Sequence, residues 1–410
     1  MKTSPENMPV RFILFLALFT SVVQVFSQTP GRVTDFRELP KLKWEFSSQS
    51  PFYASPVVHG NSVYIGGLDS ILHVLDLTSG KEKWSFRTRG EIRSAICLGN
   101  DCLFLNGGDG TIYAIHDQSG QLLWAFKTEG EWHYDFADYF HSTPVLDQDV
   151  LYFGSGDGSF YAIRAKDGSL VWQFKSGGII HTTPAISGNK LFFGSFNGYV
   201  YALNLADGAL IWKFKTVGHR YFPKGEVQGS PVVFGNLVFI GARDFNVYAL
   251  DQNKGFCHWN KSFPKGWGLS NTIHDSVLYI GTADERRLIA ANPATGAEYW
   301  NKEMEFLVFG NTTISDSMFV LGTTIGKLHG ISINTGEKIW TYSTDSYLAA
   351  HSKYFKPDDT YRNDIYSIIK SNEQFLEVEE ELGGIFSTPW LSEDQLIFSA
   401  ANGKVYCLKR

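Results

Sequence analysis

The sequence predicts an all-β fold, an eight-bladed β-propeller of four-stranded blades, from three observations that share one period. The first is a tryptophan that returns every 40 to 48 residues. The second is a fixed position in each repeat, called the slot here and most often occupied by proline. It precedes the next tryptophan by 28 residues in six copies and by 29 in one. The third is a set of short apolar runs between tight turns inside each copy. Repeats of about 40 residues with four strands each describe propeller blades. The tryptophans are Trp44, Trp84, Trp124, Trp172, Trp212, Trp259, Trp300 and Trp340.

The copy from His181 to Trp212 shows the strands of one blade. It divides into the apolar runs TPAI, LFFGS, YVYALN and ALIW, and the breaks between them read SGN, FNG and ADG. Asn-Gly and Asp-Gly between apolar runs are strong hairpin signals, because both central residues of a type I′ turn need a positive φ. Each copy therefore predicts four strands. Its tryptophan lies in the last, outermost strand, where a large ring can fill the wedge between blades.

The two ends of the repeat region predict how the ring closes. The final segment, STPWLSEDQLIFSAANGKVYCLKR, supplies three strands, and LKWEF near the start supplies a fourth on its own. Pairing Leu42–Phe46 with the strand Val405–Leu408 would close the ring and leave no open sheet edge. We therefore expect a linker at residues 28–41 and one propeller over residues 42–410, with an insertion at 341–387 between blades seven and eight.

Residues 1–27 have the pattern of a secretory signal peptide. Lys2 and Arg11 precede an apolar stretch, Phe12–Phe26, and small residues follow at the expected cleavage point. The stretch is short and polar for a membrane span, although an uncleaved anchor is the other interpretation. We expect a periplasmic or secreted protein, without membrane insertion of the mature chain. No cysteine lies near the cleavage point, so lipid attachment is not expected there.

The charge of the chain bears on its partners, and its cysteines bear on a disulfide. The net charge is −6 and no basic cluster is present, so a nucleic-acid partner is not expected. Cys97 and Cys102 flank a predicted hairpin turn and could form a disulfide in an oxidising compartment, although two buried thiols are the other interpretation. Cys257 and Cys407 fall in predicted strands as core residues.

The repeat signature resembles that of the pyrroloquinoline-quinone-type propeller family. It is carried by GNSVYIGG (60–67), GDGTIYAI (108–115), GDGSFYAI (156–163), FNGYVYAL (196–203) and DFNVYAL (244–250). Two branches of that family suggest different functions. The quinoprotein dehydrogenases bind the quinone and Ca²⁺ over the central channel. The propeller lipoprotein of the outer-membrane β-barrel assembly machinery is a non-catalytic scaffold of eight blades and similar length.

The resemblance implies a binding function more than a catalytic one. The dehydrogenases carry adjacent cysteines stacked on the cofactor, which this sequence lacks, and they are much longer. We expect an exported, non-catalytic scaffold that holds a protein or peptide of the cell envelope, with no bound cofactor and no catalytic residue. The alternative is an enzyme acting through the central funnel on a small molecule or carbohydrate, such as a quinone-dependent dehydrogenase with pyrroloquinoline quinone and Ca²⁺.

Three long connections between blades predict where function lies. The spacing from tryptophan to the next slot, 12 residues by default, rises to 20 before Pro144, 19 before Pro231 and 49 before Pro389. All such connections emerge on one face of a propeller, and loops on a rigid scaffold often carry function. The first insertion is 129–141, the second is 217–228, and the third contains 363–382, which is compatible with an acidic amphipathic helix. Rim aromatics are expected either to anchor a partner or to seal the channel. They are Trp132, Tyr221 and Trp267.

The positions three residues before each slot form a predicted ring at the mouth of the channel. In the first five blades this ring is a funnel arc of Tyr53, Arg93, His141, His181 and Gln228. Arg93 can offer a bidentate fork to a carboxylate. The two histidines would gain charge as the pH falls through about 6.5, which favours an anionic ligand. Two histidines without a third ligand predict no metal site.

Overall fold

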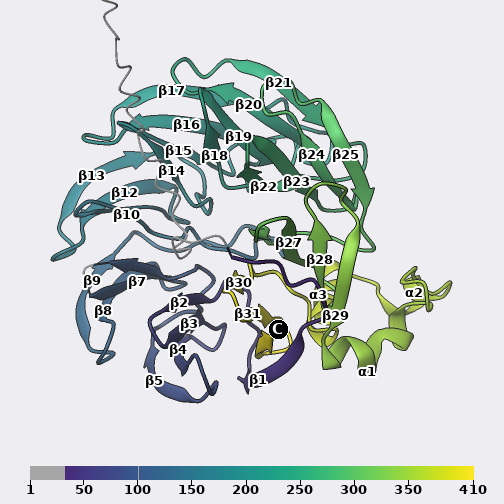
Figure 1. The fold of residues 1–410 in the computed structure, drawn as a ribbon. Helices are drawn as coiled ribbons and strands as arrows, with labels where there is room; N and C mark the ends of the chain where they lie inside the picture. Colours follow the sequence, from purple (N-terminus) through teal and green to yellow (C-terminus); the bar gives the residue numbers. More distant parts are fainter. Residues whose placement is uncertain (1–32, 100) are drawn as a thin grey trace, which may run out of the picture.

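The computed structural model describes residues 33–99 and 101–410, and in this part of the chain the strands form eight four-stranded antiparallel sheets. Figure 1 shows these sheets as blades around a ring, in chain order from purple through green to yellow. The predicted eight-bladed propeller is therefore confirmed. The predicted signal peptide, residues 1–27, lies outside the described residues.

Blades one to four each begin with the innermost strand, because the first strands of neighbouring blades contact one another around the channel. Their strands are β2 (Val57–His59), β3 (Ser62–Gly66), β4 (Ile71–Asp76) and β5 (Glu82–Arg87); β6 (Cys97–Gly99), β7 (Cys102–Gly107), β8 (Thr111–His116) and β9 (Leu122–Lys127); β10 (Val145–Asp147), β11 (Val150–Gly154), β12 (Ser159–Arg164) and β13 (Leu170–Lys175); β14 (Ala185–Ser187), β15 (Lys190–Gly194), β16 (Tyr199–Asn204) and β17 (Leu210–Lys215).

Blades five to seven repeat the same order. Their strands are β18 (Val232–Phe234), β19 (Leu237–Ala242), β20 (Asn246–Asp251) and β21 (Cys257–Ser262); β22 (Gly268–His274), β23 (Val277–Thr282), β24 (Arg287–Ala291) and β25 (Glu298–Glu303); β26 (Thr313–Ile314), β27 (Met318–Gly322), β28 (Lys327–Ser332) and β29 (Lys338–Ser343).

The eighth blade joins the two ends of the repeat region. It contains β30 (Trp390–Leu391), β31 (Gln395–Ala400) and β32 (Lys404–Lys409), and its outermost strand is β1 (Lys41–Ser47). In Figure 1 the purple β1 lies beside the yellow strands of this blade. Trp44 pairs with Cys407 and Phe46 with Val405, so the predicted closure of the ring is confirmed. The N-terminal strand therefore completes the eighth blade and joins the two ends of the repeat region.

The repeated tryptophan packs on the turn of the following blade. The indole of Trp124 donates a hydrogen bond to the carbonyl of Ala165, 3.0 Å away, and lies against Gly168. Gly168 has φ +71°, and a Cβ there would stand 2.7 Å from the ring. The same contact recurs in the other blades, which explains why tryptophan and glycine repeat together. The pairs are Trp44 and Gly80, Trp84 and Gly120, Trp172 and Gly208, Trp212 and Gly255, Trp259 and Gly296, and Trp300 and Gly336.

The last repeated tryptophan, Trp340, contacts the segment expected to be a linker. Trp340 donates its indole hydrogen bond to the carbonyl of Phe36, which is fully buried. The nearby carboxylate of Asp35 accepts hydrogen bonds from Ser315 and Ser317. The described part of residues 28–41 is therefore packed against the ring.

All three insertions lie on one face and share an apolar cluster. This cluster, called the lid here, contains Tyr139 of the first insertion and Tyr347 of the third, and Phe222 of the second insertion packs against it. It also includes side chains from the mouth of the channel, such as Phe309 and Phe386. Burial of apolar side chains therefore holds the insertions together, and the insertions cover the channel as well as its rim.

The third insertion differs from the single helix considered for 363–382. It forms α1 (Asp345–Tyr354), the short α2 (Ile365–Ile368) and α3 (Asn372–Glu381), which are green to yellow in Figure 1. The break falls at Ser371, whose hydroxyl accepts a hydrogen bond from the backbone N–H of Gln374 and caps α3. The apolar spacing across 363–382 therefore belongs to two helices with a cap between them.

Candidate functional site

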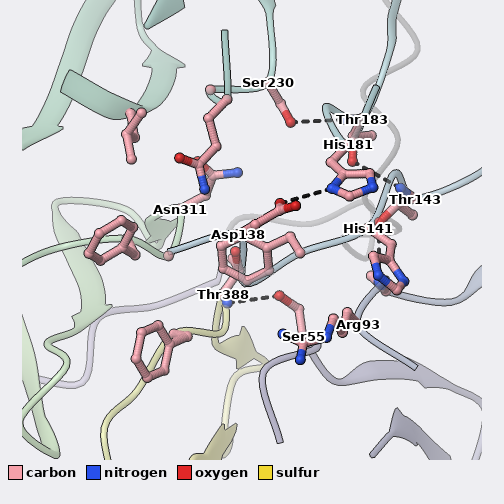
Figure 2. Close-up of a pocket in the computed structure, with 18 residues that line it drawn as sticks. Ser55, Arg93, Asp138, His141, Thr143, His181, Thr183, Ser230, Asn311 and Thr388 are labelled. Atoms are coloured by element: carbon pink, nitrogen blue, oxygen red, sulfur yellow. Dashed lines mark hydrogen bonds and ion pairs between the residues drawn. The ribbon is translucent and has the colours of Figure 1, made fainter. Parts of the chain in front are cut away.

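Four of the five residues of the funnel arc come together in one cavity under the lid, whereas Tyr53 lies in the apolar cluster beside it. Arg93, His141, His181 and Gln228 precede β6, β10, β14 and β18 at the same phase of the repeat, so they converge on the channel axis. All four line a cavity of about 100 Å³. Figure 2 shows Asp138, which sequence reasoning did not single out, directed at His181 in the same cavity. Polar and aromatic side chains close the rest of the wall; they are Ser55, Phe140, Thr143, Thr183, Ser230, Phe309, Asn311, Phe386 and Thr388.

His181 lies between two carboxylates of the first insertion. Its Nδ1 is 2.8 Å from Asp138 Oδ1 and its Nε2 is 2.7 Å from Glu131 Oε1, and all three side chains are almost fully buried. Burial alone lowers the pKa of His181, but the two carboxylates outweigh it and raise the pKa to about 10. Burial raises the pKa of Asp138, yet the imidazolium reverses this and the pKa falls below its usual value. This trio holds the first insertion onto blade four through a charged imidazole.

His141 has the opposite character. Its ring centroid is 5.2 Å from that of His181, and its buried Nδ1 has no hydrogen-bond partner. Burial lowers its pKa well below the usual value, and the nearby charges of His181 and Arg93 lower it further. His141 is therefore neutral while His181 is charged. The expectation that both histidines gain charge near pH 6.5 is wrong, because burial and partners move their pKa values in opposite directions.

The remaining members of the arc hold the lid in place. The Nε of Arg93 is 3.2 Å from Glu91 Oε1, and its guanidinium lies over the ring of Tyr53. Tyr53 is buried and donates its hydroxyl hydrogen to Glu380. Gln228 donates to the carbonyl of Ala137 at 2.6 Å. These contacts engage Tyr53, Gln228 and part of the Arg93 guanidinium within the protein.

Arg243 is a residue of this region that sequence reasoning missed. It is fully buried and lies over the rings of four aromatic side chains, which are Tyr134, Phe196, Phe222 and Trp267. Its guanidinium donates to both oxygens of Asp135. The sequence did contain a signal for it. Arg243, in the string GARDFN, directly precedes an acidic turn residue, and the equivalent position in blade three is Gly156. A large cation therefore replaces a small residue of the repeat.

The three rim aromatics have different environments. Trp132 is 63% exposed and Tyr221 is 64% exposed, so both are free to contact a partner. Trp267 is only 8% exposed and packs against Phe222 and the guanidinium of Arg243. Trp267 is therefore a packing residue of the lid, and its expected role as a surface anchor is wrong.

The structure contains no bond between the two candidate disulfide partners. Cys97 and Cys102 are both free. In the register of β6 and β7, Cys97 lies opposite Phe104 and Cys102 lies opposite Gly99. The two cysteines are therefore diagonal neighbours, a wider spacing than a direct cross-strand pair. Burial raises the pKa of Cys97 to about 12, which keeps it a thiol.

Comparison with protein families gives one match. A family model described as outer membrane protein assembly factor BamB matches residues 30–134, 109–219 and 196–352 of the chain. No curated protein sequence matches. Among the residues that the structure describes, no helix is long and apolar enough to cross a membrane.

Solved structures resemble the chain in fold. BamB from Moraxella catarrhalis aligns with a TM-score of 0.66 and 13% identity, over 91% of this chain and 100% of that one. The quinohemoprotein alcohol dehydrogenase ADHIIG from Pseudomonas putida HK5 aligns with a TM-score of 0.66 and 12% identity, over 90% of this chain and 76% of that one. The computationally designed Ika8 protein aligns with a TM-score of 0.68 and 15% identity, over 91% and 100%. These similarities show the propeller fold.

Proposed function

Because the chain belongs to the family of the outer membrane protein assembly factor BamB, we propose that it is an exported, non-catalytic scaffold. It holds a polypeptide of the cell envelope on the face that carries the three insertions. The observation that carries the proposal is the form of that face. The insertions share one apolar cluster and still expose Trp132 and Tyr221 to solvent. Large exposed aromatic side chains on a rigid support are typical of binding hot spots.

The cavity beneath the lid supports binding on the outer face rather than chemistry inside. Its volume is about 100 Å³, whereas pockets that bury a cofactor-sized ligand measure about 300–1,000 Å³. The carboxylate that lines it, Asp138, is engaged by His181. Calcium prefers several free oxygen ligands. The residues present therefore do not fit pyrroloquinoline quinone with its Ca²⁺ ion.

Site-specific photocrosslinking tests the proposal. A photoreactive residue is placed at Trp132 or Tyr221 in cells that produce the protein natively, and the cell envelope is irradiated. Phe256, 48% exposed, is the matched control, since it lies in a turn between the third and fourth strands of blade five and so on the opposite face. We expect a discrete protein adduct from Trp132 and Tyr221, and none from Phe256.

Two outcomes would overturn the proposal. One is the absence of an adduct at the insertion face, or an equal adduct at Phe256. The other is stoichiometric binding of pyrroloquinoline quinone with Ca²⁺ by the purified protein, accompanied by dye-linked alcohol oxidation. That second result would establish the enzymatic alternative.

A further inference from the structure

We propose that Glu131, His141 and His181 bind a divalent transition-metal ion, with Zn²⁺ as the best match, at the edge of the central cavity. One ligand atom from each of these residues lies within 4.8 Å of the other two. Glu131 and His141 stand at the two ends of the first insertion, and His181 precedes β14 of blade four. Two imidazoles and one carboxylate are an established ligand set for zinc, with a fourth position left open.

The unmatched nitrogen of His141 is an independent indication of a ligand. Its Nδ1 is buried without a hydrogen-bond partner, although the residue is only 4% exposed. Buried polar atoms are nearly always paired, and each exception calls for an explanation. His141 and His181 both line the cavity, where Figure 2 shows them as neighbours. A cation between these rings would give the His141 imidazole the electrostatic partner that the protein itself does not supply.

Asp138 completes the arrangement behind the proposed ligands. It is 2.8 Å from Nδ1 of His181, on the side of the ring opposite Glu131. A carboxylate that accepts the Nδ1 hydrogen fixes the histidine tautomer and directs the Nε2 lone pair at the metal. In this position Asp138 is a positioning residue. The order carboxylate, imidazole, metal is common at zinc sites.

The burial of the site favours a bound cation that is paired. The carboxylates of Glu131 and Asp138 flank His181, and all three side chains are almost fully buried. A cation bound by Glu131 would be paired with a carboxylate oxygen, and a paired charge is far less costly to bury than an unpaired one.

Small movements convert the present geometry into coordination. A tetrahedral zinc ion with ligand bonds of about 2.1 Å holds its ligand atoms about 3.4 Å apart. The Glu131 oxygen and His181 Nε2 are now 2.7 Å apart, at the distance of an ion pair, and must separate slightly. No two ligand atoms of the cluster are more than 4.8 Å apart, so any other pair needs to close by at most about 1.4 Å. A water molecule from the cavity can supply the fourth ligand, and the bound ion would tether the lid to blade four.

Metal titration of the mature, chelator-treated protein tests this site. Zn²⁺ binding is measured by calorimetry and Co²⁺ binding by its visible absorption spectrum. We expect one ion per chain, a tetrahedral Co²⁺ spectrum, and a rise in Tm on adding Zn²⁺, since a ligand that binds only the folded state stabilises it. His141→Ala should weaken both ions by about tenfold or more. His141→Cys should retain Zn²⁺ and add a thiolate-to-cobalt charge-transfer band.

His141 is the right residue to change, because Glu131→Gln would also break the ion pair with His181. The matched control is His133→Ala, since His133 lies in the same insertion, 3.9 Å from Asp138, but outside the cluster. It should bind both ions as the wild type does. Circular dichroism and Tm without metal confirm that each variant folds. Failure of the wild type to bind one ion, or equal binding by a folded His141→Ala variant, would overturn the proposal. Neither result bears on the scaffold function.

Discussion

The guanidinium of Arg243 donates to both carboxylate oxygens of Asp135, and this pair joins the first insertion to blade five. Arg243 is fully buried, whereas about one third of the Asp135 side chain is exposed, 0% against 33%. The Nε of Arg243 also donates to Gln228 Oε1 at 2.8 Å. The buried cation therefore depends on one carboxylate at the edge of the lid.

Removing Asp135 should loosen the first insertion. In Asp135→Ala the guanidinium stays buried without its anion, which costs about 3 kcal/mol, the low end for a broken buried pair because Asp135 is partly exposed. The free energy of unfolding from urea denaturation measures the loss, and hydrogen exchange should show it first in residues 129–141. Asp149→Ala, an exposed turn residue, is the control and should change stability by less than about 0.5 kcal/mol.

A double variant distinguishes the effect of the unpaired Arg243 charge from the effect of lost contact area. In a double variant, Arg243→Met with Asp135→Ala, no charge is left unpaired, so much of the lost stability should return. If the double variant is as unstable as the sum of the two single variants, the ion pair is not what anchors the insertion.

The repeat contact between Trp124 and Gly168 explains why the fold could be predicted so fully. Both residues recur at a fixed spacing, so a pattern visible in the sequence indicated a contact between neighbouring blades. The lid carries no such pattern. Arg243 pairs with Asp135 across 108 residues and His181 with Glu131 across 50. Each pairing occurs once and joins a loop to a blade, so periodicity gave no information on it. The repeat phase therefore predicted that Arg93, His141, His181 and Gln228 lie together at the channel, but it did not predict the residues that pair with them.

Two glycines test the tryptophan contact directly. Gly168 and Gly188 both have a positive φ, +71° and +59°, so alanine costs each of them about 1 kcal/mol of backbone strain. A Cβ at Gly168 meets the Trp124 ring at 2.7 Å, whereas a Cβ at Gly188 has nothing within 4 Å. Gly168→Ala should therefore lose about 1–3 kcal/mol more than Gly188→Ala, because overpacking adds to the strain. Equal losses in thermal unfolding would contradict the packing account.

Trp132 and Trp267 should separate binding from stability. Trp132→Ala removes an exposed ring, so it should leave the free energy of unfolding nearly unchanged and weaken binding to the crosslinked partner by about 2 kcal/mol or more. Trp267→Ala empties part of the lid cluster and should lower the free energy of unfolding by about 3–5 kcal/mol. Titration calorimetry and urea denaturation give the two quantities. If both variants bind the partner as tightly as the wild type does, the lid serves only to seal the channel.

Glu379 gives the lid a dependence on pH. It lies on α3, is 1% exposed, and neither of its carboxyl oxygens makes a hydrogen bond of ordinary geometry. Burial raises its pKa to about 8, and the charges of Asp284 and Glu380 add to the rise. The hydroxyls of Thr324 and Tyr139 offset only part of it. In the folded protein Glu379 is therefore a neutral acid at pH 7, whereas in the unfolded chain it is ionised.

The contribution of Glu379 to stability should consequently fall as the pH rises from about 4.5 to 8. In that window the unfolded chain loses the Glu379 proton and the folded protein keeps it, so this carboxyl lowers the free energy of unfolding by at most about 1.4 kcal/mol per pH unit. Glu379→Gln stays neutral, so its advantage over the wild type should grow from pH 5 to pH 8. Glu373→Gln, an exposed change on the same helix, should differ from the wild type by a constant amount. Urea denaturation at each pH makes the comparison, and parallel curves for the wild type and Glu379→Gln would show that Glu379 is ionised in the folded lid.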